Sequence, residues 1–200
     1  MKLYFAPGAC SLAPHIVLEE LELPHTLEQV DLKSKKTQSG EDYSTVNAKG
    51  YVPALALDDG NVLTEGCVIS QYLAELHPNK QLFPLSGLAR YQLQSLMVYI
   101  ATEIHKTIGP MFNPHQEAKS RAASEATMNK RLGWISEQLG NREFIFGEHF
   151  TIADAYLFTV LNWMNIVKVD LNQWENLTHY QQRIGTRPSV LRALKTEGLI

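Results

Sequence analysis

The sequence pattern changes near residue 80, and this change constrains the fold more than any other feature of the chain. Before it, strand-like and helix-like segments alternate; after it, nearly every periodic segment is helical. That order predicts a mixed α/β domain followed by an all-α domain. We place the first domain at residues 1–80, a linker at 81–87 and the second domain at 88–200. A chain of 200 residues is long enough for two small domains.

The first domain is expected to begin with a strand, a helix and a second strand parallel to the first. A polar stretch with one short helix follows, and then a hairpin whose turn is Asp58-Asp59-Gly60-Asn61. The segments predicted by periodicity are strands at 2–5, 26–32, 52–57 and 62–64, and helices at 11–21, 42–46 and 66–76.

The second domain is expected to contain five helices. One of them begins at Thr151, where Asp154 completes a variant of the capping box and Phe150 is placed for a hydrophobic staple. The strongly apolar sequence of this helix predicts that it is buried. The other helices are predicted at 93–108, where Gly109-Pro110 ends the pattern, and at 128–139, 176–184 and 188–197.

Composition excludes several classes of protein. The chain is 44% hydrophobic and 20% charged, as is typical of a globular protein, and its formal net charge of −3 argues against a general nucleic-acid or anionic-membrane binder. No apolar run is long enough to span a membrane, and residues 1–5 show a strand pattern rather than a signal peptide. Two cysteines without secretory features indicate a reducing compartment, so we expect a cytoplasmic protein.

Cys10 is the strongest candidate for chemistry. It lies between the first strand and the first helix, where free N–H groups and the helix dipole lower the pKa of a thiol by stabilising its thiolate. Lowering that pKa from about 8.5 by roughly 1.5 to 2 would make the thiolate a major species near pH 7. The following residues, Ser11-Leu12-Ala13, contain no resolving cysteine, and a reactive thiol here would need a small thiol cofactor as its partner. The alternative is that Cys10 is a small buried apolar residue.

Other residues of the first domain could complete a ligand site. Val52-Pro53 is either an ordinary edge proline or a cis bond that exposes the backbone of Val52 to an extended peptide. Thr64-Glu65-Gly66 precedes a helix, where N–H groups could hold a carboxylate and Glu65 an ammonium, or it is simply an acidic helix start. Lys33, Lys35 and Lys36 form either a basic patch or a solvated charge run, and Tyr51 either contacts a ligand or packs.

His105 is the candidate from the second domain. It lies on the long predicted helix beside Lys106, and it either polarises a thiol or has a structural role. The remaining histidines show no metal-ligand spacing, so we expect no metal site, and Cys67 is expected to be a core thiol. The histidines in question are His15, His25, His77, His115, His149 and His179.

Taken together, these residues resemble a known family, the bacterial beta-class glutathione transferases, over the whole chain. Val52-Pro53-Ala54-Leu55 and Thr151-Ile152-Ala153-Asp154 are shared by many transferase classes, whereas Pro7-Gly8-Ala9-Cys10 and Glu103-Ile104-His105-Lys106 are similar to the beta class in particular. The resemblance implies a thioredoxin-like N-terminal domain, an all-helical C-terminal domain, a homodimer, glutathione as co-substrate without a metal, and a detoxification role.

The resemblance also implies roles for single residues. Val52, with Pro53 cis, would pair with the cysteinyl part of glutathione, and Cys10 would face its sulfur and form a mixed disulfide. Glu65 and Gly66 would hold the γ-glutamyl end and Lys35 the glycyl carboxylate. From the helical domain, His105 and Lys106 would reach the sulfur region, while Thr102 and Glu103 would line the same wall, contributed by the same chain or by the dimer partner. Cys10 and His105 would be the catalytic residues.

One position departs from the family pattern. The family often has asparagine before the Tyr-Ile-Ala-Thr stretch, but this chain has Val98, which cannot donate a hydrogen bond. One polar contact with glutathione is therefore expected to be missing. Other transferase classes activate the thiol with tyrosine or serine; Tyr4 and Ser11 are available here, but the beta-class pattern favours Cys10.

Three functions are open at this point. A transferase would use bound glutathione thiolate to attack a hydrophobic electrophile, whereas a monothiol oxidoreductase or peroxidase would use Cys10 as the nucleophile and glutathione to resolve the mixed disulfide. A non-catalytic binding protein with the same fold is the third. The chain keeps the expected peptide-binding residues, which argues against the third function. Phe112, His115 and Trp163 are predicted to lie near the second substrate.

Overall fold

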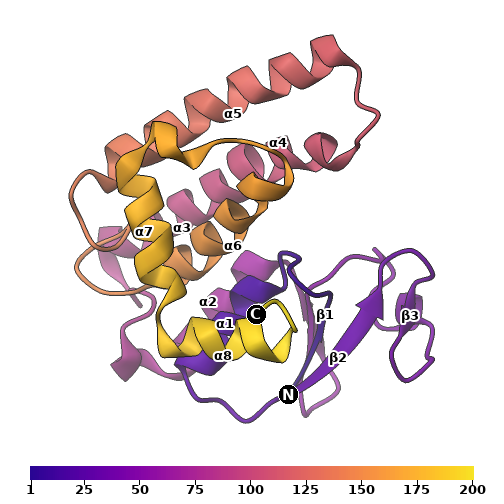
Figure 1. Ribbon diagram of the computed structural model, residues 1–200. Coiled ribbons are helices and arrows are strands. Elements are labelled where there is room, and N and C mark those ends of the chain that lie inside the picture. The colour runs from indigo at the N-terminus through magenta and orange to yellow at the C-terminus, as the bar shows by residue number, and fades with distance from the viewer.

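The computed structural model describes all 200 residues and shows a small sheet packed beside helices, with a larger group of helices above it (Figure 1). The strands are β1 Lys2–Phe5, β2 Thr26–Asp31, β3 Lys36–Thr37, β4 Ala54–Ala56 and β5 Val62–Thr64. The helices are α1 Leu12–Glu20, α2 Gly66–Leu76, α3 Gly87–Tyr99, α4 Lys106–Ile108, α5 Ala118–Leu139, α6 Ile152–Ile166, α7 Glu175–Gly185 and α8 Pro188–Thr196. A π-helical turn at Ile100–His105 joins α3 to α4, and short 3₁₀ turns lie at Tyr43–Thr45, Pro78–Lys80, Gly109–Phe112 and Leu171–Gln173.

The sheet has the order β3-β2-β1-β4-β5. β1 is parallel to β2, as the sequence predicts for a strand–helix–strand unit, and antiparallel to β4, which pairs with β5 as the predicted hairpin. β3 was not predicted, because its two residues belong to a polar segment without alternation. The central position of β1 places residues 6–11, which follow it, at the middle of the sheet edge.

α6 is the buried centre of the molecule. Twelve of its fifteen residues are buried, which confirms the burial predicted from its apolar sequence, and it packs against α1, α2, α3 and α7. One continuous hydrophobic cluster joins Leu3 of β1 and Leu12 of α1 to Leu177 of α7 and Val190 of α8. The sheet half and the helical half therefore share a core, which fixes their relative placement.

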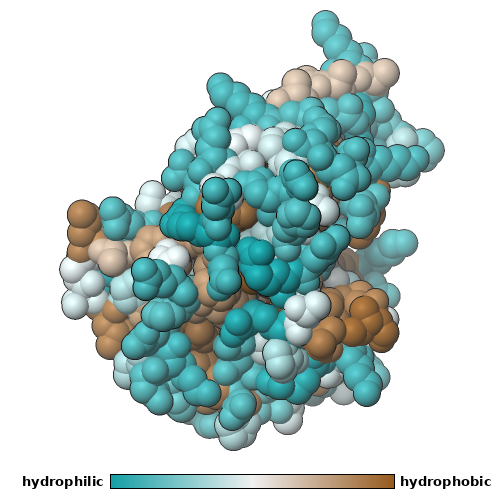
Figure 2. All heavy atoms as spheres, turned by 60° about the vertical axis from the view of Figure 1, so that its left-hand side comes forward, coloured by the Kyte–Doolittle hydropathy of each residue, from teal (hydrophilic) through white to brown (hydrophobic).

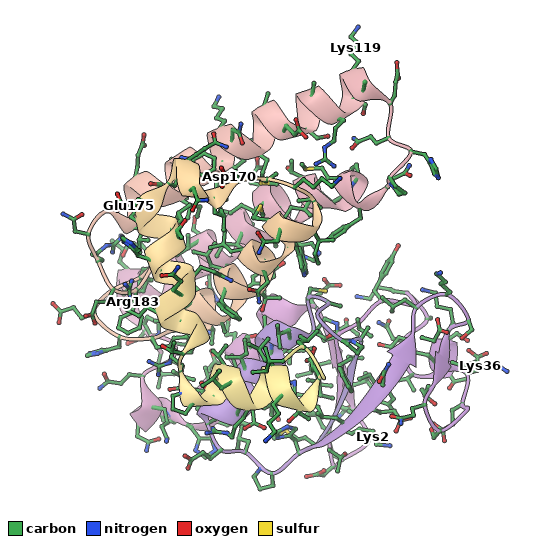
Figure 3. All side chains as sticks on the ribbon, in the orientation of Figure 1. Lys2, Lys36, Lys119, Asp170, Glu175 and Arg183 are labelled. Carbon is green, nitrogen blue, oxygen red and sulfur yellow. The ribbon has the colours of Figure 1, made fainter.

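Two helices differ from the prediction. α5 begins ten residues before the predicted start at 128, because its buried residues begin only at Met128 and the polar first half carries no apolar period. Lys119 in this half projects from the edge of the molecule (Figure 3). The helix predicted at 93–108 is not one regular α-helix, since the π-helical turn interrupts it.

The π-helical turn keeps three buried residues on one side. Ile100, Ile104 and Ile108 are four residues apart and are all fully buried. In an α-helix of 3.6 residues per turn, residues four apart differ by about 40° in their direction around the helix axis. The wider π turn keeps all three on the core side, and π turns inside helices are frequent at functional sites.

The last helix returns to the first half of the chain. α8 packs along α1, and Figure 1 shows it beside the sheet rather than with α3–α7. No helix of the molecule combines the length and the apolar character that crossing a membrane requires.

Candidate active site

A cleft of about 520 Å³ lies between the sheet half and the helical half. Its walls come from the segment after β1, the turn before β4, the start of α2 and the π-helical turn. Eight residues predicted for the site line it: Cys10, Val52, Pro53, Glu65, Gly66, Thr102, His105 and Lys106. These residues come from four separate parts of the sequence, and the fold brings them to one place.

Cys10 lies at the base of the cleft, before α1. Its thiol donates a hydrogen bond to the carbonyl oxygen of Val52, with 3.2 Å between Sγ and O. Burial raises the pKa of the Cys10 thiol to about 11, and Glu65 adds to this, although the N–H groups of Cys10 and Ser11 act in the opposite direction. The expected lowering of this pKa was therefore wrong, because desolvation outweighs the helix start. The free protein holds a neutral thiol at pH 7.

The turn before β4 presents peptide backbone to the cleft. The Val52-Pro53 bond is cis. The Tyr43 hydroxyl and the Asn47 side-chain amide both donate to the carbonyl of Tyr51, at 2.8 and 2.7 Å, and these two bonds hold the turn in place. The N–H of Val52 has no hydrogen-bond partner within the chain, so it is free to pair with an extended ligand.

Glu65 and Gly66 form the start of α2 beside this turn. Glu65 has a φ of 69° and a ψ of 113°, a backbone conformation that is strained for any residue except glycine. Its carboxylate lies 2.6 Å from the Lys49 ammonium and is largely exposed. A Cβ added at Gly66 would lie 3.6 Å from Pro53 and 3.9 Å from the carbonyl oxygen of Cys10, so the start of α2 lies beside Pro53 and the backbone of Cys10.

Two of the predicted residues do not line the cleft. The Lys35 ammonium donates to the carbonyl of Gly50 at 2.8 Å and lies 5.9 Å from the centre of the Tyr51 ring. Glu103 forms an ion pair with Arg131 of α5. The lysine of the sheet half that lines the cleft is Lys49 instead.

His105 enters the cleft from the π-helical turn. The Tyr156 hydroxyl of α6 lies 2.7 Å from Nδ1 of His105, and the ring of Trp163 packs against the imidazole with centroids 4.8 Å apart. Burial, and then the neighbouring Lys106, lowers the pKa of His105, so the ring is neutral at pH 7. Tyr156, whose pKa is raised by burial, has no other hydrogen-bond partner, so both groups are satisfied when its O–H donates to Nδ1. Nε2 of His105 then carries the proton.

The residues near this imidazole include two of those predicted for the second substrate. Trp163 also contacts Phe112, with ring centroids 5.8 Å apart, and donates from Nε1 to the carbonyl of Gly8 at 2.7 Å. His115, the third predicted residue, is exposed on the segment before α5. An aromatic wall of Phe112, His105 and Trp163 thus lies next to the segment that carries Cys10.

Sequence patterns missed three cleft residues with polar side chains: Asn47, Lys49 and Tyr156. Asn47 and Lys49 belong to an irregular segment without periodicity. Tyr156 lies within an apolar helix, where a tyrosine looks like any other core residue. Only its pairing with His105 indicates a role, and that pairing depends on the tertiary structure.

Val98 lines the cleft with an exposed side chain, at the position where an asparagine was expected. Cys67 also lines it, and its thiol lies 3.7 Å from the carbonyl oxygen of Met97.

Hydrophobic residues on one face of the molecule gather in the lower half, whereas the helical part above is mostly hydrophilic (Figure 2). No group of three potential metal ligands lines the cleft.

The chain is similar to known proteins over its full length. Residues 8–76 match the family model "Glutathione S-transferase, N-terminal domain", and residues 99–188 match "Glutathione S-transferase, C-terminal domain". The glutathione S-transferase GstA of Escherichia coli O157:H7 is 47% identical over 200 residues, which cover 100% of both chains.

Solved structures agree with this similarity. The bacterial beta-class glutathione S-transferase of Sphingomonas chungbukensis has a TM-score of 0.96 and 41% identity over 100% of both chains. A sphingomonad glutathione S-transferase complexed with glutathione has a TM-score of 0.95 and 40% identity, again over 100% of both chains.

Proposed function

Because this chain belongs to the bacterial beta class of glutathione S-transferases, we propose that its cleft binds reduced glutathione and conjugates it to small hydrophobic electrophiles. The observation that supports this most strongly is the meeting of four groups in one cleft. They are the Cys10 thiol, the unpaired N–H of Val52, the start of α2 and the neutral imidazole of His105. A tripeptide thiol offers a complementary group to each of them.

The backbone of the cleft suits an extended peptide. The free N–H of Val52 would pair with the cysteinyl residue of glutathione, and the carbonyl of Val52, which the Cys10 thiol already contacts, has a second lone pair for the same purpose. The first N–H groups of α2, at Gly66 and Cys67, would hold the γ-glutamyl carboxylate, and Glu65 its ammonium. Bound in this way, glutathione would have its cysteinyl sulfur near Cys10.

The opposite end of glutathione carries the glycyl carboxylate. Lys106 lines the cleft and supplies one positive charge. Lys35 lies outside the lining, on the carbonyl of Gly50, and would have to leave this partner to reach the ligand. We therefore propose Lys106 as the first cation to meet this carboxylate, with Lys35 as a second after rearrangement.

The proposed reaction needs a stabilised glutathione thiolate. With its pKa near 11, the Cys10 thiol remains protonated, and its single S–H would turn from the carbonyl of Val52 to donate to the glutathione sulfur, while the N–H at Nε2 of His105 would offer a second hydrogen bond. The thiolate attacks the electrophilic carbon and forms a C–S bond, and the leaving group departs with its bonding electron pair. Conjugation needs only the bound thiolate and an oriented electrophile, so Cys10 assists but is not consumed.

A second activity follows from the position of Cys10 beside the proposed sulfur site. As a thiolate, Cys10 would attack a substrate disulfide in which glutathione is joined to another thiol, forming a mixed disulfide with glutathione and releasing that other thiol in reduced form. A second glutathione thiolate would then restore Cys10 and release oxidised glutathione. The raised pKa of Cys10 makes its thiolate scarce at pH 7 and favours conjugation as the main activity.

The test compares wild-type protein with Cys10→Ser, using Cys67→Ser as a matched control. Reduced glutathione is titrated calorimetrically, conjugation of an activated aryl halide is followed by absorbance, and intact mass is measured after incubation with oxidised glutathione. We expect all three proteins to bind glutathione, and Cys10→Ser to retain a substantial part of the conjugation rate but form no adduct. Absence of glutathione binding in wild-type protein would contradict the proposal.

We also propose that the protein is a homodimer. Leu88, Tyr91 and Val98 are three and seven residues apart on α3 and are 71%, 66% and 57% exposed, so they form one apolar helix face. Val68 on α2 is exposed as well. Sedimentation velocity should give a dimer for wild-type protein and a monomer for Tyr91→Glu. A monomeric wild type at micromolar concentration would overturn this proposal.

A further inference from the structure

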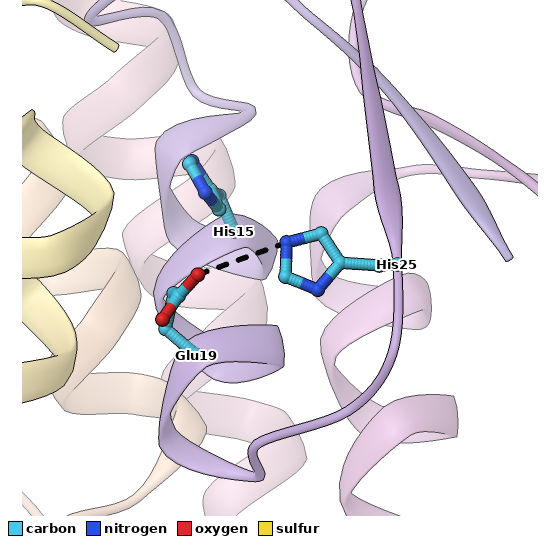
Figure 4. Close-up of side chains that lie close together, drawn as sticks. All are labelled: His15, Glu19 and His25. Atoms are coloured by element: carbon cyan, nitrogen blue, oxygen red, sulfur yellow. Dashed lines mark ion pairs between the residues drawn. The ribbon is translucent and has the colours of Figure 1, made fainter. Parts of the chain in front are cut away.

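A cluster of three potential metal ligands lies outside the cleft, where α1 meets the segment leading into β2. His15 and Glu19 are four residues apart on α1, and His25 comes from the segment before β2 (Figure 4). One ligand atom of each lies within 4.8 Å of the other two, and Nε2 of His25 is 3.8 Å from Oε1 of Glu19. The sequence predicted no metal site, because the third ligand comes from a different element.

Both imidazoles are held in the tautomer that a metal requires. Nδ1 of His25 lies 2.7 Å from the carbonyl oxygen of Leu23, which can only accept, so Nδ1 carries the proton. Nδ1 of His15 lies 2.8 Å from Oε1 of Glu197, which likewise accepts. Each ring therefore keeps its lone pair on Nε2, and Nε2 of His25 faces the Glu19 carboxylate. Hydrogen bonds of this kind, to a carbonyl or carboxylate behind the ligand, are typical of metal-binding histidines.

His15 supplies an independent indication of a ligand. Its side chain is fully buried, and its Nε2 has no hydrogen-bond partner. A buried polar atom without a partner lowers stability unless something satisfies it. The His25 ring lies beside this imidazole, with ring centroids 5.8 Å apart.

The types of ligand atom and the distances between them indicate which class of ion the cluster can bind. Two imidazole nitrogens and one carboxylate oxygen suit zinc and its neighbours in the first transition row rather than calcium or magnesium, which prefer oxygen alone. In a tetrahedral zinc site with bonds of 2.0–2.1 Å, ligand atoms are about 3.3 Å apart. The spacing here requires movements of about an ångström, which the partly exposed Glu19 and His25 side chains can make.

We propose that His15, Glu19 and His25 bind one divalent transition-metal ion of the zinc class, with water as the fourth ligand. Glu19 and Glu197 together balance the charge of the ion. Arg192 of α8 opposes binding, because its guanidinium donates to Oε2 of Glu19 at 2.6 Å and adds a positive charge. The bound ion would fasten the end of α1 to the segment before β2.

The direct test is calorimetric titration of zinc into full-length protein after chelator treatment and dialysis. We expect one equivalent to bind, and His25→Gln and Glu19→Gln to weaken binding at least about tenfold. The matched control is His179→Gln, which removes an exposed histidine that also has a glutamate, Glu175, four residues away on a helix. Equal zinc affinity in wild type and His25→Gln would overturn the proposal, as would absence of binding to wild type.

Two further measurements distinguish zinc bound by this cluster from zinc bound by a cysteine thiolate and from the effects of misfolding. Arg192→Gln removes the competing cation, so it should bind zinc several-fold more tightly, an outcome that misfolding cannot imitate. Cobalt in place of zinc should give the visible bands of a four-coordinate ion without the near-ultraviolet band of a cobalt–thiolate bond. A thiolate band, or unchanged affinity in Arg192→Gln, would assign the metal to Cys10 or Cys67, or to a site without Glu19, and would contradict the proposal.

Discussion

At the scale of single residues, the surroundings of Cys10 matter more than its position before a helix. The thiol contacts the carbonyl of Val52, and burial raises its pKa to about 11. A hydrogen bond to a carbonyl can form only with the protonated thiol, so both effects favour the same state. Sequence position predicted the helix start correctly, but it could not show how much water the fold removes from the sulfur.

The pH dependence of alkylation tests this state. At pH 7 a thiol with a pKa near 11 is ionised in about one molecule in ten thousand, and its thiolate fraction rises tenfold with each pH unit. In a Cys67→Ala background, the rate of alkylation of Cys10 by iodoacetamide, followed by intact mass, should rise about tenfold per unit from pH 7 to 10. A rate that levels off near pH 7 would show a thiolate at neutral pH instead.

Glu65 combines a strained backbone with a role in the proposed site. Its φ of 69° favours glycine, so Glu65→Gly should raise the free energy of unfolding by about 1 kcal/mol. The same change removes the carboxylate proposed for the γ-glutamyl ammonium and should weaken glutathione binding at least about tenfold. Urea unfolding and calorimetry measure the two effects.

Lys168 is the matched control, since it has a φ of 58° and lies outside the cleft. Lys168→Gly should stabilise the protein similarly and leave glutathione affinity unchanged. If both variants bind glutathione as well as wild type, Glu65 has no part in the site.

At the scale of elements, helix starts and apolar periods determined most of what the sequence could predict. The sequence correctly predicted the elements that have their own apolar period or their own turn. They are β1, α1, β2, the hairpin, α2, α7 and α8. The π-helical turn was missed, because Ile100, Ile104 and Ile108 fit an α-helical pattern when only the sequence is read. Tyr156 was also missed, because its pairing with His105 appears only in the tertiary structure. Lys35 and Glu103 were expected at the site but lie outside the cleft lining.

The start of α6 shows how much one capping residue can stabilise. Asp154 is fully buried and accepts four hydrogen bonds, from the N–H of Ile145, the N–H and hydroxyl of Thr151 and the hydroxyl of Tyr180. Because four donors would lose their partner, Asp154→Ala should lower the free energy of unfolding by at least about 3 kcal/mol. Thr151→Ala should lower it by about 1 kcal/mol.

Urea unfolding with an unchanged slope measures both variants. Asp170→Ala is the control, because Asp170 is exposed and caps only a short 3₁₀ turn at Asn172. A loss in Asp154→Ala no larger than that of the control would show that the buried carboxylate is not essential to α6.

At the scale of the whole molecule, the C-terminal segment holds the residues around Cys10 in place. The Glu197 carboxylate accepts from the N–H of Gly8 at 2.9 Å and from Nδ1 of His15. It thus connects the end of α8 both to the turn before Cys10 and to the middle of α1. Residues nearly 190 positions apart in the sequence hold one site together, which no local pattern predicts.

Glu197→Ala should therefore affect stability and binding together. It leaves the half-buried N–H of Gly8 and the buried His15 ring without a partner, which should lower the free energy of unfolding by about 3 kcal/mol and weaken glutathione binding several-fold. Lys195→Ala, an exposed change on the same helix, should do neither. Thermal unfolding and calorimetry provide the readings, and normal glutathione affinity in a folded Glu197→Ala protein would argue against this connection.

The indole of Trp163, which joins the carbonyl of Gly8 to the ring of His105, gives the protein a built-in optical signal. Trp134 of α5 packs against Tyr99 and Trp174 precedes α7; neither lines the cleft or contacts His105, so both contribute a background emission. Because Trp163 packs against His105, which lines the cleft, we expect occupancy of the cleft to change the polarity and the quenching around Trp163. Ligand entry should thus be followed as a change in tryptophan fluorescence that disappears in Trp163→Phe, without any attached dye.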